Sequence, residues 1–118
     1  MEKQTVSENP LGCPVVATLN LISGKWKPMV IHALIEQPMR FGELKKIMSP
    51  ISQKVLTQQL KELESAHILD RQVIDGKILN VTYSLTHYGM SLAPVLEALY
   101  AWGTVNIPAN ESRYSDAV

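Results

Sequence analysis

The chain of 118 residues contains one cysteine, Cys13, and only 6% of its residues are aromatic. A single cysteine excludes an intrachain disulfide and the cysteine clusters that hold structural zinc. No apolar segment approaches the roughly 18 residues that a membrane-spanning helix needs. The first ten residues are polar and lack the apolar stretch of a secretory signal. We therefore expect one domain with one core, in the cytoplasm and without a membrane contact.

Catalytic motifs are also missing from the sequence. The three histidines, His32, His67 and His87, have no carboxylate or cysteine at ligand spacing, so we expect no metal site. The chain has no Gly-rich phosphate loop, no nucleophile elbow and no paired carboxylates. We expect neither an enzyme nor a bound cofactor. A small thiol enzyme built on Cys13 stays as an alternative, and it needs a base close to that thiol.

Net charge is zero, because 11 basic side chains balance 11 acidic ones, but the charges are unevenly distributed. Residues 24–61 carry seven basic and two acidic side chains, whereas residues 62–118 carry three basic and seven acidic ones. A basic segment of this kind is typical of nucleic-acid-binding proteins. On charge alone, an ordinary solvated surface is the preferred interpretation.

Apolar residues at helical spacing predict four helices in the first half of the chain. They cover residues 13–22, a segment from Ser23 or Gly24 to Gln37, residues 41–48 and residues 53–65. Pro28 falls in the first turn of the second helix, and the Gln37-Pro38 pair ends it. The third helix should bury Phe41, Leu44, Ile47 and Met48.

The fourth helix has the pattern most typical of a DNA reader. Ser52 is a good N-cap, and Leu56, Leu60 and Leu63 form an apolar face. The opposite face contains no acid and offers amide, ammonium and hydroxyl groups that bind base edges in the major groove. It consists of Gln53, Lys54, Thr57, Gln58 and Lys61.

Alternating residues predict two strands, at 69–73 and 81–85, joined by the turn Asp75-Gly76-Lys77. Two short helices followed by a hairpin make a winged helix-turn-helix, a mostly helical α+β fold that usually reads double-stranded DNA. A winged helix that binds another protein instead of DNA is the main alternative, and salt-dependent duplex binding distinguishes the two. The predicted DNA-binding residues are Arg40, Lys45, Lys46, Ser52, Gln53, Lys54, Thr57, Gln58, Lys61 and Lys77, with Lys25 and Lys27 as further candidates for phosphate contacts.

A long fifth helix, capped by Thr86 and kinked at Pro94, carries more apolar residues than a small core needs. Together with the first helix it is predicted to form a homodimer, since a reader of palindromic DNA needs two recognition helices. The winged-helix domain should then cover residues 13–106, between a mobile arm (1–12) and a flexible tail (107–118). The predicted interface residues are Val16, Leu19, Leu92, Val95, Leu96, Leu99 and Trp102.

Cys13 lies where the first helix begins. The helix dipole at that position favours the reactive thiolate form of a cysteine. A lone cysteine is nevertheless more often a small buried apolar residue, and the chemistry alone favours that interpretation.

Seven motifs in this order resemble the HxlR family of bacterial winged-helix regulators, which are related in architecture to the MarR type. The resemblance covers roughly residues 13–103. The motifs are CP at 13–14, GKWK at 24–27, RFGEL at 40–44, LTQQLKELE at 56–64, YSLT at 83–86, SLAPVL at 91–96 and WG at 102–103.

The resemblance implies a cytoplasmic homodimeric transcription factor whose terminal helices form the dimer. It also implies that Cys13 matches a cysteine with which some members sense oxidants or electrophiles. With the resemblance included, the sensor and the structural interpretation of Cys13 are about equal. A small-molecule or oxidant effector fits this expectation, and its identity stays open.

Overall fold

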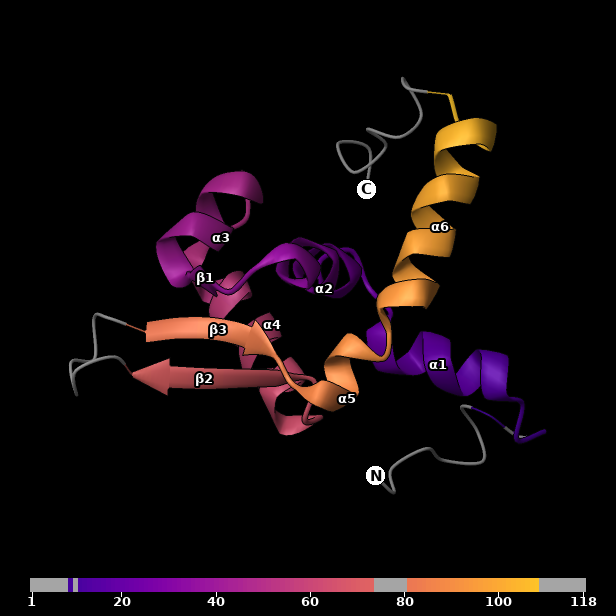
Figure 1. Cartoon of the computed structure of the whole chain (residues 1–118), viewed down its shortest axis with the longest axis horizontal. Helices are drawn as coiled ribbons and strands as arrows, with labels where there is room; N and C mark the ends of the chain where they lie inside the picture. Colours follow the sequence, from indigo (N-terminus) through magenta and orange to yellow (C-terminus); the bar gives the residue numbers. More distant parts are fainter. Residues whose placement is uncertain (1–8, 10, 74–80, 109–118) are drawn as a thin grey trace.

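The computed structural model describes residues 9, 11–73 and 81–108. Lys77 and the turn at 75–77 lie outside the described residues, as do most of the predicted arm and tail. Figure 1 shows the wing strands at one end of the molecule and the first and last helices at the other. The elements are α1 (Pro14–Ile22), α2 (Lys27–Glu36), β1 (Met39–Arg40), α3 (Phe41–Ile47), α4 (Gln53–Ser65), β2 (Leu69–Val73), β3 (Val81–Leu85), α5 (His87–Met90) and α6 (Ala93–Asn106).

The strands form an antiparallel sheet in the order β1-β3-β2. β2 and β3 pair with Leu69 opposite Leu85, which confirms the two predicted strands. β1 pairs with the other edge of β3, where Met39 lies opposite Tyr83. The sequence did not predict β1 because two residues are too few to show an alternation. The mostly helical α+β class and the winged helix-turn-helix are confirmed.

Helix α4 has the predicted bounds and the predicted apolar face. The Ser52 hydroxyl accepts a hydrogen bond from the Val55 N–H at 3.1 Å and so caps the helix. Leu56, Leu60 and Leu63 are buried in the core. The opposite face of α4 is therefore the one left for solvent or a partner.

Helix α2 begins later than predicted. Gly24 has a φ of 110°, a left-handed conformation that glycine adopts readily, and this turn separates α1 from α2. Pro28 lies in the first turn of α2, as predicted, and the helix ends at Glu36 just before Gln37-Pro38.

Ile47 is a correction to the predicted core. Its side chain is 55% exposed, whereas Leu44 and Met48 are buried. Those two residues are four positions apart and share the face of α3 that packs on the core. Ile47 lies at the last position of the helix and points to solvent.

The predicted long fifth helix is two helices, not one kinked helix. α5 ends at Met90, and Pro94 lies in the first turn of α6, where its missing N–H costs nothing. Leu92 precedes α6 and packs against the core, and Leu96 is only 4% exposed within its own chain. Leu96 therefore fills the core and is not open to a partner, contrary to its predicted place in the dimer interface.

The start of α5 is joined to the chain that leaves α4. His67 has a left-handed φ of 64°, and the Ile68 N–H bonds back to the Leu63 carbonyl at 3.0 Å. The Thr86 hydroxyl donates to the His67 carbonyl at 2.6 Å and accepts from the Gly89 N–H at 2.8 Å. A Cβ on Gly89 would lie 2.2 Å from the Ile68 carbonyl oxygen. Only glycine fits at this contact.

Gly89→Ala is expected to lower the free energy of unfolding by about 1–3 kcal/mol, because the added methyl group meets backbone that cannot move aside alone. Chemical denaturation of the parent and the variant measures this difference. Gly42→Ala is the matched control, since a Cβ at Gly42 meets nothing within 4 Å. That control should be neutral or more stable, because alanine favours a helix over glycine. Equal stability of Gly89→Ala and its parent would contradict the assigned contact.

Candidate nucleic-acid interface

The polar face of α4 is exposed along its length. Its members Gln53, Lys54, Thr57, Gln58 and Lys61 are all exposed, as predicted from the spacing of the three core leucines. No acidic residue occupies the first turn of α4. The first two turns therefore present hydrogen-bond donors, acceptors and positive charge. The face is not free of acid along its whole length, because the exposed carboxylate of Glu62, one turn further on, accepts a hydrogen bond from Gln58.

Two hollows lie beside α4 on the side of the sheet. The larger, of about 630 Å³, is lined by Arg40, Lys46, Gln53 and Arg71 among others. The smaller, of about 320 Å³, includes Thr57, Lys61 and again Arg71. Predicted DNA-binding residues of β1, α3 and α4 thus lie around the Arg71 side chain of β2.

Arg71 was not among the predicted site residues. It is exposed, and its pairing partner in the sheet is Tyr83, which lines both hollows with it. The sequence gives one indication of its role, because Arg71 is the first lysine or arginine after α4. Its position beside α4 depends on strand pairing, which the linear pattern does not give.

The other predicted residues have different places. Arg40 precedes α3, where its backbone N–H donates to the Glu43 carboxylate at 2.9 Å. Lys45 is half-buried and lines neither hollow, whereas Lys46 is exposed. The hydroxyl of Ser52 is engaged as the helix cap.

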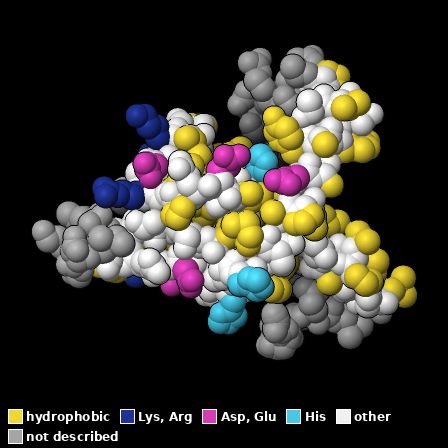
Figure 2. Space-filling view, in the orientation of Figure 1, with side chains coloured by type: hydrophobic (Ala, Val, Ile, Leu, Met, Phe, Trp, Pro, Cys, Tyr) yellow, Lys and Arg dark blue, Asp and Glu magenta, His cyan; other side chains and the backbone are white. Residues whose placement is uncertain are grey.

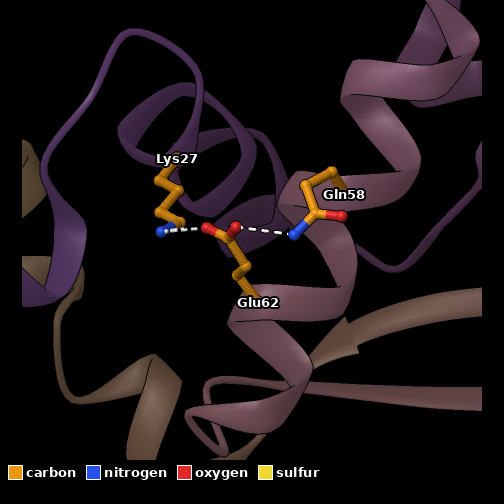
Figure 3. A network of polar contacts seen from close by, with 3 residues as sticks. All are labelled: Lys27, Gln58 and Glu62. Carbon is orange, nitrogen blue, oxygen red and sulfur yellow. Dashed lines mark hydrogen bonds and ion pairs between the residues drawn. The ribbon is translucent and has the colours of Figure 1, made fainter. Parts of the chain in front are cut away.

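One carboxylate links α2 to the polar face of α4 (Figure 3). Glu62 Oε1 lies 2.6 Å from the Lys27 ammonium, and Oε2 accepts a hydrogen bond from Gln58 Nε2 at 2.7 Å. The Gln58 hydrogen bond and then the Lys27 contact hold the pKa of Glu62 below its ordinary value. The charged form is therefore favoured in the folded state, and its small stabilising effect is present near neutral pH and lost as the pH falls through the lowered pKa. Lys27 is engaged in this ion pair.

Hydrophobic side chains gather over α6 and α1, away from the Lys and Arg side chains that lie over α3 (Figure 2). Among the predicted dimer residues, Trp102 is 63% exposed, Leu99 51% and Leu19 50%. Val95 is also exposed, and Val16 is half-buried. α6 is held against α2 by a stacked pair, with the His32 and Tyr100 rings 5.2 Å apart. Exposed apolar side chains that gather on one part of a surface are typical of an interaction site.

Cys13 is the residue just before α1; its side chain makes no capping hydrogen bond and is half-buried. Its backbone N–H donates to Asn9 Oδ1 at 2.9 Å, and Asn9 Nδ2 donates to the Cys13 carbonyl at 3.1 Å. These two bonds fix the backbone on either side of the thiol.

The profile of the HxlR-like helix-turn-helix family matches residues 21–111. The chain belongs to this family. It is 38% identical over 117 residues to YybR, a helix-turn-helix transcriptional regulator of Bacillus subtilis, and the match covers 99% of this chain and 94% of that relative. Further relatives, among them YdeP and YodB of B. subtilis, are likewise helix-turn-helix transcriptional regulators, which agrees with the sequence-based expectation of a transcriptional regulator.

Solved structures agree with this assignment. The redox regulator HypR in its reduced form has a TM-score of 0.78 and 39% identity, covering 85% of this chain and 99% of that chain. Reduced YodB, a transcriptional regulator from B. subtilis, has a TM-score of 0.69 and 35% identity, with 80% and 94% coverage. The resemblance seen in the sequence is therefore confirmed at the level of the fold and the family.

The described part of the chain contains neither a metal-binding cluster nor a membrane-spanning helix. Within residues 9, 11–73 and 81–108, no three His, Cys, Asp or Glu side chains are grouped so that they could hold a metal ion. Over the same residues, every helix is too short or too polar to cross a bilayer.

Proposed function

We propose that this protein is a cytoplasmic homodimeric regulator that binds a palindromic operator in double-stranded DNA. The observation that carries the proposal is the exposed polar face of α4, which has hydrogen-bonding and positively charged side chains opposite a buried leucine face. Such a helix fits the major groove, where Gln and Lys bind base edges and Thr contacts a thymine methyl. Lys54, Thr57 and Gln58 are the proposed base-reading residues, with Gln53 and Lys61 beside them.

The phosphate contacts are proposed to come from basic residues around α4 and from Ser52 at its start. Arg40, Lys46 and Arg71 converge on the larger hollow next to the reader helix. Lys45 belongs to the same helix as Lys46, Ser52 lies at the start of α4, and Lys77 is proposed as the wing contact. Contacts of this kind orient the protein on the duplex and make its affinity depend on salt.

Lys46→Ala with Arg71→Ala is expected to weaken binding to every duplex and to flatten the salt dependence. Each lost phosphate contact should reduce the slope of log affinity against log salt by about 0.9. Titrations of one duplex at several salt concentrations measure the slope. The charge-preserving pair Lys46→Arg with Arg71→Lys is the control and should keep it. An unchanged slope in the alanine variant would remove both residues from the interface.

The dimer is proposed to form through α1 and α6, with Val16, Leu19, Val95, Leu99 and Trp102 at the interface and Leu92 at its edge. The support is the exposed apolar surface on these two helices, at the opposite end from the basic residues of α3 (Figure 2). A two-fold axis there would place two copies of α4 on one face of the duplex. Reading helices bind half-sites about 34 Å apart.

Cys13 is proposed as a regulatory thiol. The support is its place at the start of α1, next to the proposed interface, together with the similarity to HypR, which is a redox regulator. A peroxide would convert the thiolate to sulfenic acid, and a second thiol would then displace water to form a disulfide. That second thiol is a small cellular thiol or Cys13 of the other protomer.

Mild peroxide treatment is expected to change the operator affinity of the parent protein and to leave the operator affinity of Cys13→Ser unchanged. Affinity before and after treatment, followed by reduction, measures the effect, and a non-reducing gel separates an interchain disulfide from a capped thiol. If peroxide changes the operator affinity of both proteins equally, or does not change that of the parent, Cys13 has a structural role instead.

A further inference from the structure

The side chain of Gln58 is held by a partner on its own helix. Gln58 Nε2 donates to Glu62 Oε2 at 2.7 Å, one turn further along α4. Figure 3 shows the Gln58 carbonyl oxygen pointing away from this carboxylate. The amide therefore has a defined direction before any DNA is bound.

This restraint matters because a glutamine amide has two chemically different ends. A freely rotating amide presents either its carbonyl acceptor or its NH₂ donors to a base. An ionised carboxylate can only accept hydrogen bonds, so it binds the NH₂ end and rejects the carbonyl end. Glu62 thus removes one of the two orientations of Gln58.

The carboxylate is itself anchored from another helix. The Lys27 ammonium of α2 lies 2.6 Å from Glu62 Oε1, and the Lys27 side chain is only 19% exposed. This ion pair balances the negative charge that Glu62 would otherwise bring close to DNA phosphates. Lys27 therefore acts on Glu62 and is not a phosphate ligand in this arrangement.

We propose that Glu62 is a positioning residue that turns the Gln58 carbonyl toward DNA and so selects a base with an exocyclic amino group. The inference rests on the proposed function of α4. In the major groove adenine and cytosine offer such an amino group, whereas guanine presents two acceptors. The second N–H of Gln58 stays open for adenine N7, so adenine is the expected base.

The experiment compares which duplexes each variant selects from a randomised pool. The proteins are the parent, Gln58→Ala, Glu62→Ala and the double variant. Glu36→Ala is the control, since it removes one exposed acid from α2, the helix that carries Lys27. Glu62→Gln is a second control, which keeps the side-chain length and an acceptor oxygen but removes the charge. Thermal melting of each variant shows whether its fold survives.

Glu62→Ala is expected to reduce the preference for adenine at one position of each half-site about fivefold to tenfold. The position should be the one that Gln58→Ala relaxes, and the double variant should relax it no further than Gln58→Ala alone. Glu62→Gln should have a smaller effect, and Glu36→Ala should select the parent's motif.

Two results would overturn the inference alone. In the first, Glu62→Ala selects the parent's motif with the same preference for adenine as the parent. In the second, Glu62→Ala loses base preference equally at every position of the motif, which indicates a general structural effect. A parent that selects no motif would instead overturn the proposed function, and this inference with it. The two failures are therefore distinguishable.

Discussion

Replacing Lys54, Thr57 and Gln58 together by alanine is expected to weaken specific operator binding by more than a hundredfold. One lost base contact costs about 1–3 kcal/mol, and a dimer loses each contact twice. The stability of the fold should be retained, because all three side chains are exposed on α4 and alanine is a strong helix former. Titration of an operator duplex against an unrelated duplex measures the loss of specificity.

The residual, non-specific affinity of that variant is an internal control. The residues around the larger hollow, Arg40, Lys46 and Arg71, are unchanged in it and should still bind any duplex at low salt. Ser65→Ala, an exposed change in the last turn of α4, should leave specific binding intact. Operator binding as tight as the parent's would show that this face of α4 does not read bases.

A charge at the proposed dimer interface is expected to have the second large effect. Leu99→Glu places two like charges near a two-fold axis in an apolar contact, at a cost of about 3 kcal/mol or more for each unpaired charge. The dimer dissociation constant should therefore rise more than a hundredfold. Because Leu99 is 51% exposed in one chain, the monomer itself should stay folded.

Sedimentation at micromolar concentration measures this change. Ile47→Glu is the matched control, since Ile47 is 55% exposed but belongs to α3 at the other end of the molecule. That variant should sediment as the parent dimer does. A monomeric parent, or a dimeric Leu99→Glu protein, would contradict the proposed interface.

The features predicted well from sequence are those fixed by local interactions. The bounds of α4 follow from the Ser52 cap and from apolar residues at helical spacing, and both are visible within 14 consecutive residues, 52–65. Strands β2 and β3 are similar, because β-branched and aromatic residues within each short segment predict a strand, and both strands lie at the predicted residues, 69–73 and 81–85. The motifs of the family are likewise short and ordered along the chain.

The features that were missed depend on contacts between distant segments. β1 exists only because β3 offers it an edge, and Arg71 joins the site only through the pairing of β2 with β3. Leu92 and Leu96 likewise meet the core of their own chain, although their spacing is equally compatible with a dimer interface. Periodicity shows that these residues are apolar, but it does not show whether they face the core or a partner.

The Lys27–Glu62–Gln58 network also depends in part on a contact between distant segments. Glu62 and Gln58 are one helical turn apart, so their contact is visible in the sequence as a spacing. Lys27 comes from α2, and only the packed fold brings its ammonium to Glu62. The sequence therefore suggested Lys27 as a phosphate contact, whereas the structure pairs it within the protein.

In the proposed complex, two copies of α4 read the two halves of one operator. Footprinting of the protein on the duplex that it selects from its own genome tests this most directly. We predict two protected half-sites related by two-fold symmetry, with centres about 10 base pairs, or a whole number of turns, apart. Protection of a single half-site, or equal protection of any duplex, would contradict the account.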